Sequence, residues 1–381
     1  MVVSSEKSFR RYDLDWLRVL AILSVYIFHS VHFFDTGDWS VKNATTYSWI
    51  SWLMDLMGVW LMPLIFVVSG ASVFYAAGKS NVRSFLWDKI MRLLIPLLIG
   101  VFTFSITQVY VERIHHGQFQ GSLIEFIPNY FEGVYLPGGT GNFAFHGMHL
   151  WYVLLLFSFT LLFMPLFWWF KSKNGEKILR RIGNFLALPG CIFFIMIPTI
   201  IIQNLTNNAN FIENGYWRLI QFPWFFIAGY LIISHETIPF RIIQSRWIAI
   251  GIAIFIVVIT LAQQKVVDDH ADALVWPVII AILGFAMKHL NYSNSFLAYA
   301  NKAVMPFYIL HQNILLWLGF FVVNWSIPDF MKFVLISVTT FLFIMIFYQY
   351  LIYPNNWLRI IFGMKPIKKP HLSREGQIIC N

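Results

Sequence analysis

The chain has 381 residues, of which 58% are hydrophobic and only 12% are charged. Soluble domains carry about 25% charged residues, so this composition excludes an ordinary soluble domain and predicts a polytopic membrane protein. A net charge of +9 can indicate a nucleic acid partner, but here the basic residues stand between apolar segments, so we expect no nucleic acid. Two cysteines, Cys191 and Cys380, are too few for a disulfide framework or a cysteine metal site, and we expect no metal and no bound cofactor.

Ten apolar segments follow one another along the chain, each close to the roughly 20 residues that a membrane-spanning helix needs. They cover about residues 14–34, 49–77, 93–111, 148–170, 185–203, 217–234, 247–263, 273–289, 304–324 and 332–353. The predicted fold is an all-α polytopic membrane protein, a bundle of about ten transmembrane helices. Residues 1–363 form this domain, and residues 364–381 form a basic cytoplasmic tail that touches anionic lipid.

The positive charges predict the orientation of the bundle. With the N-terminus in the cytoplasm, 22 of the 27 Lys and Arg residues fall in cytoplasmic segments. Because basic loops remain on the cytoplasmic side, we expect both termini to be cytoplasmic. The longest outer connection is then 112–147, which contains Glu132 and is either a functional loop or a flexible linker. The expected location is the plasma membrane of a bacterium or archaeon.

The first apolar segment places a cation and an imidazole on one face. Arg18 and His29 are eleven residues apart. At about 100° per residue that spacing is roughly three turns plus 20°, with a rise of about 16 Å, half of a bilayer's hydrocarbon core. Asp15 either orients Arg18 toward an anion or simply pairs with it at the helix start. Ionisable groups inside a span usually face a cavity or a partner, so His29 is a candidate catalytic residue; the alternative is a neutral histidine bonded to a helix carbonyl.

Three further features fall at the same predicted membrane surface as Arg18. The Ser69-Gly70 step allows close approach either of a ligand or of another helix. Lys89 and Arg92 lie one turn apart and form either an ordinary cytoplasmic charge signal or a phosphate clamp. This convergence on one surface indicates a site for a cytosolic anionic donor.

A second group of candidates lies on the predicted outer side or within a span. His149, Trp151 and Tyr152 open the fourth apolar segment, where aromatic rings beside a histidine suit either an interfacial belt or a sugar-binding face. His311 lies about two turns into the ninth segment and is another buried polar group that needs a partner.

Taken in order, these motifs resemble the membrane-bound acyltransferase family 3 over most of the chain. The family's arginine–histidine motif, with ten residues between, corresponds to Arg18 and His29. Its phenylalanine–serine–glycine motif corresponds to Phe66, Ser69 and Gly70.

The family's basic R-x-x-R motif corresponds to Lys89 and Arg92. Lys89 departs from the usual arginine; it keeps the charge but loses the bidentate fork. The His149-Leu-Trp-Tyr run and the ending Leu-Arg-Ile-Ile-Phe-Gly-Met-Lys-Pro (358–366) also resemble the branch that modifies periplasmic glucans.

The resemblance implies an enzyme that moves an acyl group, acetyl or succinyl, from cytoplasmic acyl-CoA to a carbohydrate hydroxyl on the far side. It implies donor contacts at Arg18, Ser69, Gly70, Lys89 and Arg92. It implies that His29 is the general base or acyl carrier. The residues expected to face the acceptor are His149, Trp151, Tyr152, His311 and Glu132. The alternatives are a transporter or flippase for an anionic lipid or sugar carrier, and a non-catalytic partner in an envelope complex; a homo-oligomer is compatible with each.

Overall fold

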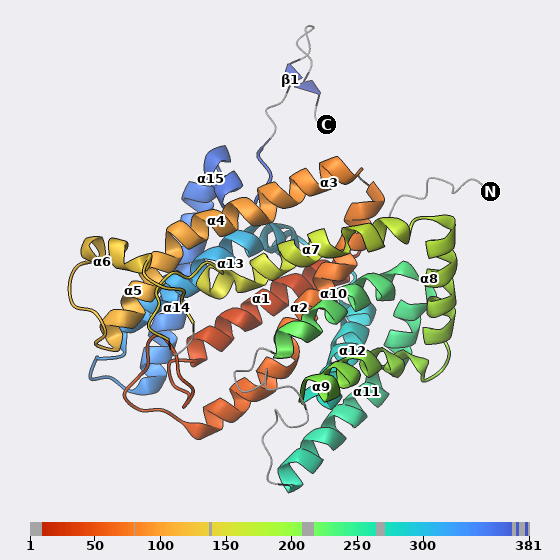
Figure 1. Ribbon diagram of the computed structural model, residues 1–381, viewed down its shortest axis with the longest axis horizontal. Coiled ribbons are helices and arrows are strands. Elements are labelled where there is room, and N and C mark those ends of the chain that lie inside the picture. The colour runs from red at the N-terminus through yellow and green to blue at the C-terminus, as the bar shows by residue number, and fades with distance from the viewer. Residues whose placement is uncertain are drawn as a thin grey trace.

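The computed structural model describes residues 10–79, 81–136, 139–207, 217–263, 271–367, 371–372 and 378–379, and nearly all of its regular structure is helical (Figure 1). The elements in chain order are α1 (Tyr12–Val31), α2 (Ser48–Lys79), α3 (Val82–Lys89), the π-helical η1 (Ile90–Leu94), α4 (Ile95–Phe102), α5 (Phe104–His115), α6 (Leu123–Tyr130), the 3₁₀ turn η2 (Met148–Leu150), α7 (Trp151–Trp169), α8 (Lys173–Leu186), the 3₁₀ turn η3 (Cys191–Met196), α9 (Ile197–Asn207), α10 (Trp217–Ser234), α11 (Thr237–Ala262), α12 (Ala271–His289), α13 (Ser295–Val322), α14 (Asp329–Phe347), the π-helical η6 (Tyr348–Ile352), α15 (Asn356–Ile361), β1 (His371–Leu372) and β2 (Ile378–Ile379). The predicted all-α class is confirmed for the described residues.

Eight helical stretches among the described residues are long and apolar enough to cross a membrane. They are Tyr12–Val31, Ser48–Gly78, Val82–His115, Met148–Trp169, Thr237–Ala262, Ala271–His289, Ser295–Val322 and Asp329–Ile352. The apolar part of α10, Leu219–Ser234, is shorter. The chain is therefore a multi-pass membrane protein with eight such helices, or nine with the bent pair described next; the count of ten and the cytoplasmic termini stay predictions.

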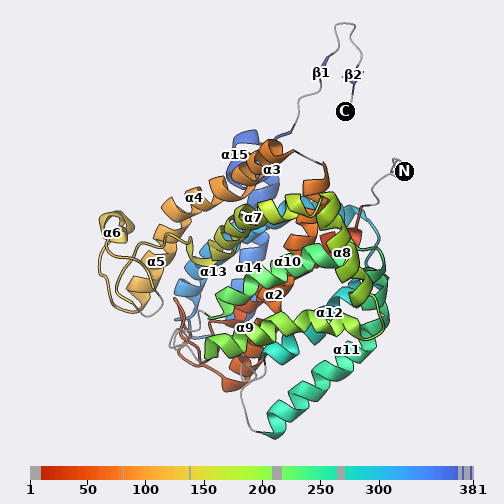
Figure 2. The ribbon, with the colours of Figure 1, turned by 45° about the vertical axis from the view of Figure 1, so that its right-hand side comes forward.

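The apolar segment expected over 185–203 begins at a sharp bend of the chain. The structure places a bend of 119° between Lys173–Leu186 and Cys191–Leu205. Pro189 and Gly190 cause the break, because proline cannot donate a helix hydrogen bond and Gly190 adopts a left-handed φ of 79°. As a result, α8 runs across its neighbours at one side of the bundle in both views (Figures 1 and 2).

The helix α1 lies in the middle of the bundle and contacts α2, α12, α13 and α14 (Figure 1). Its neighbour α2 in turn crosses α10, and the two backbones nearly touch at the crossing. A Cβ built on Gly70 would lie 1.8 Å from the Phe226 carbonyl oxygen, and one built on Gly229 would lie 2.0 Å from that of Val67. Only glycine allows this approach, which is a common way for membrane helices to pack.

The connection 112–147 is organised around the buried Arg113. Its Nε donates to Asn142 Oδ1 at 2.8 Å, Nη1 donates to Gln118 Oε1 at 2.5 Å, and Nη2 donates to the Gly141 carbonyl at 2.9 Å. These bonds favour an ordered loop over the flexible linker that the sequence also allowed. We call this end of the bundle, which also carries the connection between α1 and α2, the loop end.

The opposite end of the bundle, where α1 begins, holds Arg18, Lys89 and Arg92, and we call it the basic end. The chain after α15 also returns to it, through residues 363–365. Within the predicted tail, β1 and β2 pair in antiparallel fashion, and residues 368–370, 373–377 and 380–381 lie outside the described part.

Candidate functional site

A cavity of about 410 Å³ lies at the basic end, between α1, α2, η1, α7 and α13. Its lining includes six cationic side chains, namely Arg18, Lys89, Arg92, Lys302, Arg359 and Lys365. Asp88 is the one carboxylate among the described residues that line it. We call it the basic cavity. An excess of positive charge in a partly buried hollow attracts polyanions, and guanidinium groups bind phosphate oxygens particularly well.

The guanidinium of Arg18 is held in a fixed position. Its Nη1 donates to Asp15 Oδ1 at 3.1 Å and to Asn301 Oδ1 at 3.2 Å, and its Nη2 donates to Ser72 Oγ at 2.8 Å. Asp15 also accepts from Arg10 Nε at 2.8 Å. Asp15 thus forms the expected ion pair and helps to hold the Arg18 guanidinium beside the basic cavity, while orientation of Arg18 toward an anion stays a prediction.

The Lys89–Arg92 motif runs into a π-helical turn, a distortion that often occurs at functional sites. Pro96 has no N–H, so the Arg92 carbonyl cannot make its usual helix bond. Gly363, with a left-handed φ of 71°, packs there instead: a Cβ on it would lie 2.7 Å from that carbonyl oxygen. Arg92 Nε donates to the Gly363 carbonyl at 3.4 Å, so the returning chain also holds the guanidinium.

Ser69 and Gly70 face different ways. The Ser69 hydroxyl lies 2.6 Å from the Tyr152 hydroxyl, and both residues line the basic cavity. Gly70 lies at the crossing of α2 with α10 and lines neither of the two cavities described here. Its predicted contact with a donor therefore stays a prediction, while its packing role follows directly from the geometry.

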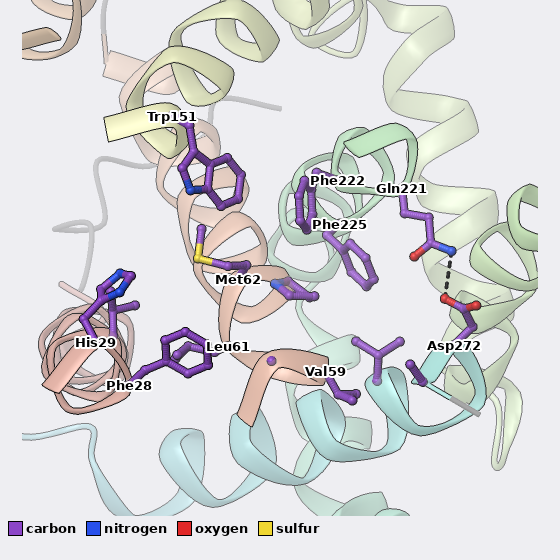
Figure 3. A pocket seen from close by; sticks show the side chains of 15 residues that line it. Phe28, His29, Val59, Leu61, Met62, Trp151, Gln221, Phe222, Phe225 and Asp272 are labelled. Carbon is purple, nitrogen blue, oxygen red and sulfur yellow. Dashed lines mark hydrogen bonds between the residues drawn. The ribbon is translucent and has the colours of Figure 1, made fainter. Parts of the chain in front are cut away.

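His29 borders a second cavity, of about 300 Å³, between α1, α2, α7, α10 and α12 (Figure 3). We call it the aromatic cavity, because Phe28, Trp151, Phe222 and Phe225 contribute much of its lining. The buried Nδ1 of His29 has no hydrogen-bond partner among the described residues. The alternative of a histidine bonded to a helix carbonyl is therefore not supported for this nitrogen.

Two further histidines, His311 and His149, continue from His29 in a row of ring contacts. The ring centroids of His29 and His311 are 5.4 Å apart, and those of His149 and His311 are 5.1 Å apart. The Nδ1 of His311 donates to the Tyr308 carbonyl at 2.6 Å, and the Nε2 of His149 lies 3.1 Å from the Ile309 carbonyl. The structure thus brings together three of the predicted residues, from α1, η2 and α13, although they are up to 282 positions apart in the sequence.

The connection between α1 and α2 covers His29 from the loop end. Trp39 stacks on His29 with centroids 6.0 Å apart and on His32 at 4.8 Å. Asp35 fixes this connection, because its Oδ2 pairs with His32 Nδ1 at 2.7 Å and its Oδ1 accepts a short bond from Lys42 Nζ. Burial tends to raise the pKa of Asp35, but the hydrogen bonds from His32 and Lys42 outweigh burial and keep that pKa below its ordinary value.

The two cavities approach each other at the start of α7. The consecutive residues Trp151 and Tyr152 line the aromatic and the basic cavity respectively. On α1, Ile22 lines the basic cavity and Val25 lines the aromatic one, and these residues are three positions apart, a rise of about 4.5 Å. The two cavities are thus neighbours along α1 and at the start of α7.

One candidate residue lies away from both cavities, and other residues near the cavities were not among the candidates. Glu132 is exposed in the loop-end connection and lines neither cavity, so its predicted contact with an acceptor stays a prediction. Conversely, the sequence analysis missed Arg359, Lys365 and Trp39 as neighbours of the site. Arg359 and Lys365 lie near the end of the chain, far in sequence from Arg18 and Lys89, and Trp39 lies in a short connection with no recognisable motif.

Comparisons with known proteins identify the family to which the chain belongs. A family model described as an acyltransferase domain, Acyl_transf_3, matches residues 11–349, and the chain belongs to this family. The chain is similar to glucans biosynthesis protein C of Salmonella heidelberg strain SL476 and of Salmonella agona strain SL483. Each match is 22% identical over 345 residues and covers 84% of this chain and 86% of the relative. No solved structure gives a significant match.

The chain is therefore a multi-pass membrane acyltransferase, and its resemblance to acyltransferase family 3 is confirmed.

Proposed function

We propose that this enzyme transfers an acetyl or succinyl group from acyl-CoA to a hydroxyl of an extracytoplasmic carbohydrate. The observation that carries the proposal is the approach of two chemically different cavities along α1. The basic cavity suits the phosphates of the donor, and the aromatic cavity contains a histidine that can act on a hydroxyl. Family membership supports acyl transfer, and the glucan biosynthesis relatives support a carbohydrate acceptor.

The donor enters from the basic end, which faces the cytoplasm in the predicted orientation. Arg18 and Arg92 form charge-assisted bonds to its phosphates, and Lys89 adds a third cation as a single ammonium rather than a planar fork. The pantetheine arm is long and flexible, so it can pass Ile22 and bring its thioester to His29.

The proposed reaction uses one general base, His29. His29 removes the proton from the acceptor hydroxyl, and that oxygen attacks the thioester carbonyl. The new C–O bond replaces the C–S bond, and the imidazolium returns the proton to the sulfur of CoA. A route through an acyl-imidazole at His29 gives the same products. His149 and His311 act as positioning residues for the His29 ring.

Binding and transfer can be measured separately on the purified protein in lipid nanodiscs. Arg18→Ala should weaken CoA binding by calorimetry about tenfold or more, because a charge-assisted bond is lost. His29→Ala should leave CoA binding within about twofold and abolish transfer of radiolabelled acetyl, since only the base is removed. Lys177→Ala, an exposed cation on α8, is the matched control and should change neither.

Full transfer by a well-folded His29→Ala protein would contradict the assignment. Movement of an anionic lipid across liposomes by the wild-type protein in the absence of acyl-CoA would favour the transporter alternative instead.

A further inference from the structure

The wall of the aromatic cavity opposite His29 contains a buried polar pair, Gln221 on α10 and Asp272 on α12 (Figure 3). Gln221 Nε2 donates to Asp272 Oδ1 at 2.8 Å, and both side chains are buried. The pair also links two helices, so part of its role is structural. Its position on the wall of a cavity beside a candidate base, however, gives it access to a ligand.

The hydrogen-bonding groups of Gln221 and Asp272 determine which kind of ligand this wall can bind. A carboxylate has about four acceptor positions, so Asp272 can hold Gln221 and accept from a ligand hydroxyl at the same time. The carbonyl oxygen of Gln221 points away from Asp272 and is a second acceptor (Figure 3). Two acceptors suit a molecule rich in hydroxyl donors. None of the described residues that line this cavity is a lysine or an arginine, so a phosphate would be buried there without a cationic side chain to bind it, and a plain acyl chain would leave the polar pair without ligand bonds.

The remaining lining suits the apolar faces of a sugar ring. Trp151 and Phe222 stack with centroids 5.7 Å apart and planes at 29°, and both line the cavity. Small-molecule sites are typically apolar and aromatic hollows with a few well-placed polar groups, and a volume of about 300 Å³ lies at the lower end of their usual range. The cavity thus has room for one sugar unit rather than for a long chain.

We propose that the aromatic cavity is the acceptor subsite of the enzyme. Asp272 and Gln221 bind hydroxyls of a neutral sugar unit, Trp151 and Phe222 pack against its ring, and one hydroxyl is presented to His29. This assignment rests on the proposed acyl transfer and adds the residues that select the acceptor. It also separates the two substrates: the anionic donor belongs to the basic cavity and the neutral acceptor to the aromatic one.

The test uses the native acceptor in the cell. In the organism that encodes the chain, the gene is replaced by Asp272→Asn, and acyl groups on envelope glycans are measured by mass spectrometry. The same variant is purified, and its hydrolysis of acetyl-CoA, in which water replaces the acceptor, is measured with its CoA affinity. Asp272→Asn preserves size and should lower glycan acylation about tenfold or more, because a bond to a charged acceptor is lost. Hydrolysis and CoA affinity should stay within about twofold.

Matched variants separate binding from structure. Trp151→Leu should lower glycan acylation in the same way, whereas Trp247→Leu, an exposed tryptophan on α11, should not. Thr340→Val on α14 removes a buried hydroxyl that lines neither cavity, and it controls for the loss of a buried polar group.

The outcomes are distinct. Unchanged glycan acylation in Asp272→Asn overturns the acceptor subsite. An equal loss of glycan acylation and of acetyl-CoA hydrolysis also overturns it, since the residue would then act on the donor or on the fold. If the wild-type protein neither binds CoA nor changes glycan acylation relative to a deletion, the proposed function itself fails.

Discussion

The crossing of α2 and α10 decides between two roles for Gly70, contact with the donor or helix packing. Since a Cβ and an oxygen essentially never approach within 3.0 Å, Gly70→Ala forces the backbones apart by about 1.2 Å. Overpacking of this kind costs about 1–3 kcal/mol, and more where only backbone can move. Gly229→Ala forces a separation of about 1 Å at the same crossing from the other helix. If Gly70 acts through packing, the two variants should behave alike.

The assay is thermal inactivation of the purified protein, followed by CoA binding on the fraction that remains folded. Both variants should lower the midpoint temperature of thermal inactivation by several degrees, on the order of 5 °C. Gly251→Ala on α11 is the control, because a Cβ there meets nothing within 4 Å and alanine is the better helix former. A different result would refute the packing role and support a donor contact. In that result, Gly70→Ala loses CoA binding but keeps its stability, whereas Gly229→Ala keeps both CoA binding and stability.

The other predictions concern the wall of the basic cavity, the phosphate contact and the loop end. Ala21→Leu adds bulk to the wall of the basic cavity, so CoA binding by calorimetry and acyl transfer should both fall several-fold; Leu20→Phe on the exposed face is the control. Arg92→Ala should weaken CoA binding about tenfold by calorimetry, and an unchanged affinity would remove Arg92 from the donor site. Because the folded state lowers the pKa of Asp35, its carboxylate stabilises the fold above the ordinary value of about 4, and this contribution is lost as the pH falls through the folded-state pKa. The midpoint of unfolding should therefore fall on acidification more in the wild-type protein than in Asp35→Asn.

The fold could be predicted from the sequence where a single rule dominates. A run of about 20 apolar residues must form its hydrogen bonds internally in lipid, so the expected segments coincide with helices. The rule did not reveal the bend at the start of the segment 185–203, because hydropathy alone carries no information on the direction of the chain. Pro189 and Gly190 turn the chain there, and the residues before them form the separate helix α8.

The site could be predicted only where its residues stand close together in the sequence. Asp15 and Arg18 are one turn apart, and so are Lys89 and Arg92, so helical geometry alone brings each pair together. Asp272 gave no such signal, because a carboxylate in the first turn of a helix is commonly stabilised there by the helix dipole. Its partner Gln221 comes from α10, and only the packing of α10 against its neighbours reveals the pair.

Arg18 and His29 lie at the two ends of one row of cavity-lining residues on α1. The residues of α1 that line the two cavities are Arg18, Ala21, Ile22, Val25, Phe28 and His29. These positions recur every three or four residues, so they form one stripe along a single helix face. The stripe has the guanidinium of Arg18 at one end, apolar side chains in the middle, and at the other end the imidazole of His29, which can accept a proton. An acyl donor has the same order of parts, with phosphates, a mostly uncharged arm and a thioester. In the proposed reaction the length of the stripe would set the position of the thioester, and inserting or deleting a helical turn within it should misplace the thioester even if every side chain were retained.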